Sequence, residues 1–272
     1  NYDQKIVERA LNLCGKARAL DPKLTNIDNT YAVLLSMSGQ EKEAIEILTK
    51  NIPKEAPAAM WCNIGAVHFL SNDLQEARRA FQRAMDDPRA TKKTPDGGSE
   101  IHEYHHGYHM LATLELMQDN PQALATIEQG IKLQSAGNEK NHFGFYLVKA
   151  RILLSLAGVQ DPLQANAAAL VARGLNPDKA PDRYVERYLA LSYLRLNQLE
   201  NARLAIERSR TAMDLPVYNH LLLALAEAKA GNAEAALSAI AEAEHQRPAD
   251  LRTPGSVKRS RHMGMIWFES AE

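Results

Sequence analysis

The stretch WCNIGAVHFLSNDLQEARRAFQRAMDDP, residues 61–88, decides the fold. Its alanine and other apolar residues recur at spacings of three and four, which is the period of a helix with one buried face. The pattern stops before Pro88, because a proline cannot be accommodated in the interior of a helix. Strand-like alternation is missing here and in the rest of the chain. Helices are therefore the only regular elements that the sequence predicts.

The same pattern recurs along the chain. An alanine is followed four positions later by an apolar or small residue, and three positions after that by another small residue. The anchoring alanines are Ala10, Ala44, Ala77, Ala123, Ala165, Ala202 and Ala236. Neighbouring anchors lie 34, 33, 46, 42, 37 and 34 residues apart. A period near 34 in a helical chain is typical of an array of helix-turn-helix repeats, and the longer intervals indicate insertions.

Residues 61–88 resemble the tetratricopeptide repeat, whose pattern runs W-x2-L-G-x2-Y, then A-x3-F-x2-A, then P. The matching residues are Trp61, Ile64, Gly65, His68, Ala77, Phe81, Ala84 and Pro88. Weaker matches follow Tyr31, Leu189 and Leu223, whereas the repeat with Leu111 is degenerate and the next has an ambiguous register at 158–162. The resemblance covers roughly residues 3–248. It implies an all-α, right-handed α-solenoid.

The resemblance also implies an organisation for the whole chain. We expect a solenoid over residues 1–250, made of a half repeat at 3–22, about six further repeats and an insertion at about 89–101. The half repeat is either a capping helix or, in the preferred interpretation, part of a longer solenoid whose start has been trimmed. Residues 251–272 leave the pattern and end in the apolar patch 265–268. We expect this tail to cap the last repeat, with an exposed hook for another protein as the alternative.

Composition excludes several classes of protein. With 45% hydrophobic and 24% charged residues among 272, the chain has enough apolar material to fold. Its 32 basic and 33 acidic residues give a net charge of -1, which argues against a nucleic-acid partner. No apolar run is long enough to predict a membrane span. Cys14 and Cys62 are too few for a disulfide framework. The compartment stays open, with a cytoplasmic location slightly favoured. The alanine-rich repeats slightly favour a bacterial source.

One segment matches a catalytic motif. His102-Glu103-Tyr104-His105-His106 reads H-E-x-x-H, in which two histidines one helical turn apart bind zinc and the glutamate activates water. The flanking residues are charged, the expected third ligand is missing, and the neighbouring insertion is too short to build a protease cleft. A solvent-facing or groove-facing histidine cluster, with a pKa near about 6.5, is preferred. Metal binding and a zinc hydrolase stay as alternatives, through the candidate ligands His102, His106 and His109.

Other catalytic signatures are not found in the sequence. It contains no P-loop, no G-x-G-x-x-G, no G-x-S-x-G and no C-x-x-C. Cys62 has no basic neighbour in sequence that would activate its thiol, so an inert cysteine is expected. We therefore predict neither an enzyme nor a cofactor.

The family resemblance implies a groove lined by the first helix of each repeat, where a segment of another protein binds. Carried over to this sequence, the candidate groove residues are Asn26, Asn29, Cys62, Phe69, His105, Tyr108, Tyr184, Arg187 and Tyr218. A clamp for a terminal carboxylate is not expected, because Arg187 is the only inward cation. The predicted function is a scaffold or adaptor for a protein or peptide partner. The alternative is a regulatory or sensor segment of a larger signalling or transcription-regulatory protein. The oligomeric state stays open.

Overall fold

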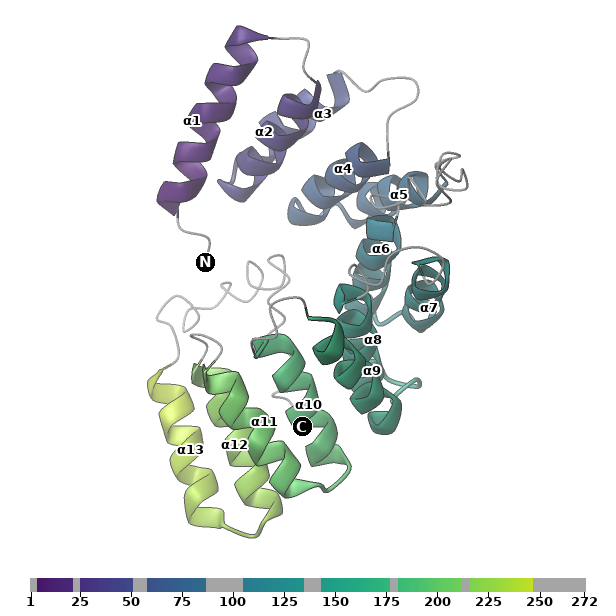
Figure 1. Cartoon of the computed structure of the whole chain (residues 1–272). Coiled ribbons are helices and arrows are strands. Elements are labelled where there is room, and N and C mark those ends of the chain that lie inside the picture. The colour runs from purple at the N-terminus through teal and green to yellow at the C-terminus, as the bar shows by residue number, and fades with distance from the viewer. Residues whose placement is uncertain are drawn as a thin grey trace. The chain divides into compact units, whose positions relative to one another are not determined.

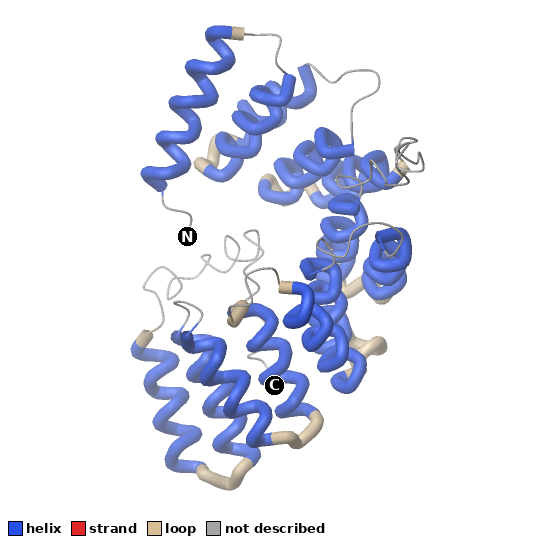
Figure 2. Tube along the Cα trace, viewed as in Figure 1, coloured by secondary structure: helices blue, strands red, loops and turns tan. Residues whose placement is uncertain are grey.

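The computed structural model describes residues 4–21, 25–50, 58–86, 105–134, 143–176, 181–211 and 216–246. Every regular element in these ranges is an α-helix (Figure 1, Figure 2). The helices are α1 Gln4–Leu20, α2 Thr25–Met37, α3 Glu41–Lys50, α4 Ala58–Leu70, α5 Leu74–Met85, α6 His105–Met117, α7 Gln122–Gln134, α8 Phe143–Ser155, α9 Pro162–Leu175, α10 Arg183–Arg195, α11 Leu199–Thr211, α12 Pro216–Lys229 and α13 Ala233–His245. The chain divides into an N-terminal unit, Asn1–Leu114, and a C-terminal unit, Glu115–Glu272, which are described separately.

The helices pack as consecutive pairs. In the N-terminal unit α2 packs on α3 and α4 on α5; in the C-terminal unit the pairs are α8 with α9, α10 with α11 and α12 with α13. Each pair also contacts the next through α3 with α4, α9 with α10, and α11 with α12. We call the even-numbered helices α2 to α12 the A helices and the odd-numbered helices α3 to α13 the B helices. This arrangement confirms the predicted all-α solenoid.

The turn from an A helix to its B helix follows one design in most pairs. The second residue after the A helix adopts a left-handed backbone, which glycine, asparagine and aspartate tolerate best. These residues are Gly39, Asn72, Asp119, Asn197 and Gly231. The next amide then donates to a carbonyl five residues back, as Asp73 N does to His68 O at 2.8 Å and Gln198 N to Tyr193 O at 2.8 Å. The bond closes the end of the A helix and turns the chain tightly into the B helix.

Aspartates start several helices. The Asp182 carboxylate accepts hydrogen bonds from the amides of Tyr184 and Val185, at 2.9 and 3.0 Å, at the start of α10. Asp161 does the same for Gln164 at 2.9 Å, and Pro162 follows it where a helix needs no amide donor. The hydrogen bond from the backbone amide of Gln164 is the main cause of the lowered pKa of Asp161. Local sequence therefore fixes where these helices begin.

The two helices of a pair approach through residues of complementary size. In the N-terminal unit Gly65 of α4 faces Phe81 of α5, and a Cβ at Gly65 would lie within 3.0 Å of three atoms of that buried ring. The equivalent pair in the C-terminal unit is Ala190 of α10 and Ile206 of α11, both buried. Six of the seven anchoring alanines are buried too, and Ala10 is half-buried; the buried ones are Ala44, Ala77, Ala123, Ala165, Ala202 and Ala236. The repeat pattern thus records the packing of each A helix on its B helix.

The repeat with the ambiguous register, α8 and α9, differs in its turn. Residues 156–161 connect α8 to α9, and they form a longer connection than the three residues 196–198 that join α10 to α11. Gly158 has the left-handed backbone here, and Asp161 N donates to Leu153 O at 3.0 Å. The extra residues explain the ambiguous register of this repeat. Helix α1 lies within the residues of the expected half repeat, 3–22, whose assignment stays a prediction. The expected insertion at 89–101 and the tail at 251–272 lie outside the described residues.

Candidate functional site

A stripe along one side of the A helices in the C-terminal unit is the candidate site. Ala150, Ala190 and Ala224 occupy equivalent buried positions in α8, α10 and α12. Residues six and three before each alanine, and one and five after it, share one side of the helix. They are Gly144, Leu147, Arg151 and Ser155 on α8; Tyr184, Arg187, Leu191 and Arg195 on α10; and Tyr218, Leu221, Leu225 and Lys229 on α12. We call these twelve residues the A-helix stripe.

The A-helix stripe lies on the accessible side of its helices. All its residues except Arg187 are at least partly exposed, and Leu225 reaches 40%. Residues on the other sides of α10, such as Val185 and Leu189, are fully buried and belong to the hydrophobic core with α9 and α11. The stripe therefore presents leucine and tyrosine side chains that pack on the core with one part and stay accessible with another.

Contacts between neighbouring A helices hold the stripe together. The Arg187 guanidinium lies 4.6 Å from the ring centroid of Tyr218, so α10 and α12 share a cation–π contact. Towards α8, Arg195 of the stripe donates to the main-chain carbonyl of Leu154. Leu191 packs against the cluster that contains Leu154. Helix α10 also packs directly on both α8 and α12. The three A helices thus form one continuous layer.

The stripe carries cations and no acids. Its charged residues are Arg151, Arg187, Arg195 and Lys229. The acidic side chains of α10 and α12 contact B helices instead: Glu227 accepts two hydrogen bonds from Arg203 of α11, at 3.1 and 3.2 Å. The Asn232 side chain also donates a hydrogen bond to the Glu227 carboxylate, at 2.7 Å. This bond is the main cause of the lowered pKa of Glu227. Opposite charges are thereby sorted to different sides of the A helices.

Glu186 is the buried carboxylate next to the stripe. Its residue is 1% exposed, and its Oε1 atom lies 3.9 Å from Nη1 of Arg173 on α9. Burial raises the pKa of Glu186 because the ionised form loses hydration, and the charges of Arg173 and Arg208 oppose this rise in part. Glu186 and Arg187 are neighbours in sequence but occupy different sides of α10. Only the arginine belongs to the stripe.

The groove residues predicted in the N-terminal unit are mostly covered. Cys62, Phe69 and Tyr108 are 7%, 6% and 4% exposed. Cys62 packs with Ala58, Ala84 and Trp61, so its position favours a packing role. Asn29 is half-buried, and the side chains of Asn26 and His105 lie outside the described residues. The assignment of these residues to a groove stays a prediction.

In the C-terminal unit the structure brings the predicted residues together. Tyr184, Arg187 and Tyr218 all belong to the A-helix stripe, and the last two are in contact. Sequence reasoning missed Leu147 and Arg151 because the register of α8 was ambiguous. It also took Arg187 as the only inward cation and missed Arg195 and Lys229, which share its side of the A helices. Ala150 was the available signal, since it matches Ala190 in the next A helix once α8 and α10 are aligned from their first residues. The stripe is therefore wider than the sequence predicted.

The histidine motif falls largely outside the described residues. His102 and Glu103 precede α6, and nothing is described of the His106 side chain. His109 is half-buried in α6. In the part of the chain that the structure describes, no group of three or more His, Cys, Asp and Glu side chains is placed to hold a metal ion. Metal binding through His102, His106 and His109 stays an alternative prediction.

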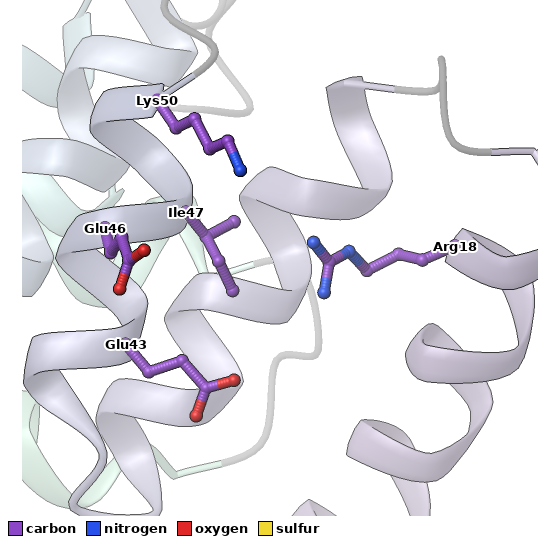
Figure 3. A pocket seen from close by; sticks show the side chains of 5 residues that line it. All are labelled: Arg18, Glu43, Glu46, Ile47 and Lys50. Atoms are coloured by element: carbon purple, nitrogen blue, oxygen red, sulfur yellow. The ribbon is translucent and has the colours of Figure 1, made fainter.

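A shallow depression of about 270 Å³ lies in the N-terminal unit (Figure 3). Arg18 of α1 approaches it from one side, and the other lining residues belong to α3. Arg18 already contacts α2, through Asp28 at 2.5 Å and through the ring of Tyr31 at 4.7 Å. The remaining lining residues are Glu43, Glu46, Ile47 and Lys50. Two cations balance two acids here, so we assign no ligand to this depression.

No helix in the described ranges is both long and apolar enough to cross a membrane.

Comparisons with known proteins agree with the fold. No protein-family model matches the chain. An 85-residue segment is 29% identical to tetratricopeptide repeat protein 13 of Homo sapiens; it is 31% of this chain and spans 10% of that protein.

Solved structures resemble much more of the chain. A chain in the crystal structure of the APC/C hetero-tetramer Cut9-Hcn1 has a TM-score of 0.62 and 16% identity, over 94% of this chain and 46% of that one. The assembly chaperone of RpL4, Acl4, has a TM-score of 0.59 and 16% identity, over 89% and 96%. BtubC from P. vanneervenii has a TM-score of 0.55 and 15% identity, over 92% and 91%. At such low identity the likeness establishes the architecture. The chain therefore has the all-α solenoid architecture of these structures, and one segment of it is similar to a tetratricopeptide repeat protein.

Proposed function

We propose that the chain is a non-enzymatic interaction scaffold that holds a segment of another protein against the A-helix stripe of its C-terminal unit. The stripe itself is the observation that carries this proposal. It combines four leucines, of which Leu225 is 40% exposed, with two tyrosines and three arginines. Tyrosine and arginine are enriched among the residues that contribute most to binding at protein interfaces. The mechanism is recognition, because the surface offers apolar contact area and hydrogen-bond donors on rigid helices.

The rigidity of the layer supports this role. Tyr218 is held by Arg187, and Arg195 is held by the carbonyl of Leu154, so both side chains have restricted freedom before any partner arrives. Binding to a preorganised surface costs less conformational entropy than binding to a mobile one. A segment that crosses α10 and α12 would therefore meet ordered side chains on both helices.

The solved structures with the same architecture are consistent with such a role. Cut9-Hcn1 is named as a hetero-tetramer, and Acl4 is named as an assembly chaperone of RpL4. Each name describes work done together with another protein. The proposal extends this kind of role to the present chain and leaves the identity of its partner to experiment. The groove residues predicted in the N-terminal unit would extend the same surface.

Site-specific photo-crosslinking in cells tests the proposal. A photoreactive residue replaces Leu225 in the stripe, and in a matched protein it replaces Leu204 of α11, which is also exposed but lies on a B helix. We expect defined crosslinked products from position 225 and not from position 204. The partner is then identified by mass spectrometry, purified and titrated against the unmodified chain.

The binding titration includes a Tyr184→Ala/Leu225→Ala variant and a Leu204→Ala control. Both stripe positions are partly exposed, so their truncation should leave folding intact, which circular dichroism checks. Loss of affinity in the stripe variant alone supports the proposal. Equal affinity in all three proteins, or crosslinks that favour position 204, contradicts it.

A further inference from the structure

We infer that the segment held by the A-helix stripe is acidic, with apolar side chains between its carboxylates. This inference rests on the proposed function and adds the chemistry of the partner. Four of the twelve stripe positions are cationic, four are leucine, two are tyrosine, and none is acidic. A surface of this composition complements a peptide that alternates Asp or Glu with leucine or aromatic residues.

The fold does not require cations at these positions. In the N-terminal unit the equivalent residues of α2 and α4 include Asn29, Val33, Cys62 and Ala66, all of them uncharged. The helices pack into the same architecture there. The cations of the C-terminal stripe are therefore a property of this surface rather than of the repeat.

Helix electrostatics account for two of the four cations, and the contact with the Tyr218 ring accounts for Arg187. Arg195 and Lys229 are the last residues of α10 and α12, where a positive charge also interacts favourably with the helix dipole. Arg151 and Arg187 lie before the last turn of their helices, where this interaction has decayed. For the two terminal cations, a thermal melt of the charge variants measures the stability role, and a binding titration measures the binding role.

The apolar residues lie between the cations. Going along α10, the stripe runs from Tyr184 to Arg187, Leu191 and Arg195. Neighbouring helix axes lie about 8–10 Å apart, so an extended peptide of about ten residues is long enough to cross all three A helices. Such a peptide would place leucine or aromatic side chains on Leu191 and Leu225, and carboxylates near Arg195 and Lys229. Arg195 and Lys229 are both exposed and thus open to a ligand.

Selection from a random peptide library tests the inference. The intact chain is immobilised, peptides of about ten residues displayed on phage are selected, and the recovered sequences are synthesised with a fluorescent label. Dissociation constants are measured by fluorescence anisotropy at low and high salt. We expect recovered peptides to be enriched in Asp and Glu together with leucine or aromatic residues. Their affinity should fall as salt rises, because salt screens exposed charges.

Matched variants connect this binding to the stripe. Arg195→Glu/Lys229→Glu reverses two stripe charges, and Lys132→Glu/Arg210→Glu makes the same change in net charge on exposed residues of the B helices α7 and α11. We expect about a tenfold or greater loss of affinity in the first variant and less than about twofold in the second. If the first variant unfolds in a thermal melt, Arg195→Gln/Lys229→Gln replaces it, and a smaller loss in the same direction is expected.

The outcomes separate the two proposals. Neutral or basic peptides that lose affinity with Tyr184→Ala/Leu225→Ala would overturn the acidic partner and leave the scaffold role supported. Peptides that bind this variant undiminished would count against the stripe as the binding surface, and so against both proposals. The same holds if no peptide is recovered. Equal losses of affinity in the stripe variant and in the B-helix variant would show that only the net charge of the chain matters. This result would overturn the inference.

Discussion

One cation–π contact of the N-terminal unit and one of the C-terminal unit lie on different layers of the same fold. In the N-terminal unit Arg83 of the B helix α5 stacks on Trp61 of the A helix α4, with 4.6 Å between the guanidinium and the ring centroid. In the C-terminal unit Arg187 and Tyr218 both come from A helices. The first contact joins the two helices of one repeat, whereas the second joins the A helices of neighbouring repeats. A repeat can thus use the same interaction for internal packing or for building a surface.

Equivalent positions show the same division. Three residues before the small residue of the A helix, the N-terminal unit has Cys62, which is buried against Ala84. The C-terminal unit has Arg187 and Leu221 there, in a layer with exposed neighbours. Cys62 and Arg187 are equally buried, at 7% exposed, but Cys62 packs against small apolar residues, whereas Arg187 contacts the ring of Tyr218 in the next A helix. The predictions below test this contrast, beginning with the largest expected effect.

The first prediction concerns the close approach of Gly65 to Phe81. Gly65→Ala should lower the free energy of unfolding by about 1–3 kcal/mol, because the new methyl group overlaps the buried ring. In the C-terminal unit the equivalent residue is Ala190, so Ala190→Gly should cost only about 1 kcal/mol, chiefly through helix propensity. Urea denaturation measures both.

A double variant controls for propensity. In Gly65→Ala/Phe81→Leu the smaller side chain leaves space for the new methyl group. The double variant should therefore lose less stability than the sum of the losses of the two single variants. Strict additivity of the two changes would show that the glycine does not serve the close approach of the helices.

The second prediction concerns a buried polar pair of the C-terminal unit. Ser209 of α11 donates to Oδ1 of Asn219 in α12 at 2.9 Å, and both residues are buried. Ser209→Ala should cost about 1–2 kcal/mol, because the amide oxygen of Asn219 loses its donor. The equivalent residue in the N-terminal unit is Ala84, so the substitution installs a residue that the other unit uses. Urea denaturation measures the loss.

Ser209→Ala/Asn219→Leu removes both partners and should recover part of that stability. A neutral effect of Ser209→Ala alone would mean that the pair does not stabilise the contact between repeats, and would remove one difference between the units.

Much of the fold could be predicted because small residues repeat where helices approach. Ala77 and Ala202 are fully buried at the A-to-B contact, as the pattern of the anchors required. The longer α8 to α9 connection obscured the register of its repeat, since insertions shift the spacing without changing the helices. The exposure of the groove candidates could not be predicted from the pattern of one repeat. Tyr108 is buried and Tyr184 is partly exposed although both occupy first helices, because neighbouring helices decide exposure.

The third prediction compares two tyrosines under arginines. Tyr218→Leu removes the ring below Arg187 and should cost about 0.5–1 kcal/mol in stability and also weaken peptide binding. Tyr31→Leu removes the ring below Arg18 in the N-terminal unit and should cost a similar amount without changing binding. Thermal melts and anisotropy titrations of both variants give the comparison. If the two variants weaken binding equally, the A-helix stripe is not the distinguishing surface.

The smallest expected effect is a change in the pH dependence of stability. Glu186 has its pKa raised by burial above the ordinary value of 4.5, so the folded state holds this proton more tightly than the unfolded chain does. Its contribution is fully present below about pH 4.5 and is lost as pH rises through the raised pKa. Glu186→Gln stays neutral, so its stability relative to the natural chain should increase over that range and then level off.

Urea denaturation at several pH values measures the difference between the two proteins, and Glu207→Gln on the exposed side of α11 serves as the control. Because Glu186 lies on a different side of α10 from the stripe, the substitution should leave peptide affinity at neutral pH unchanged. A parallel pH dependence in the natural chain and Glu186→Gln would show that this carboxylate does not respond to its burial. A loss of affinity would show that the buried and accessible sides of α10 do not act separately.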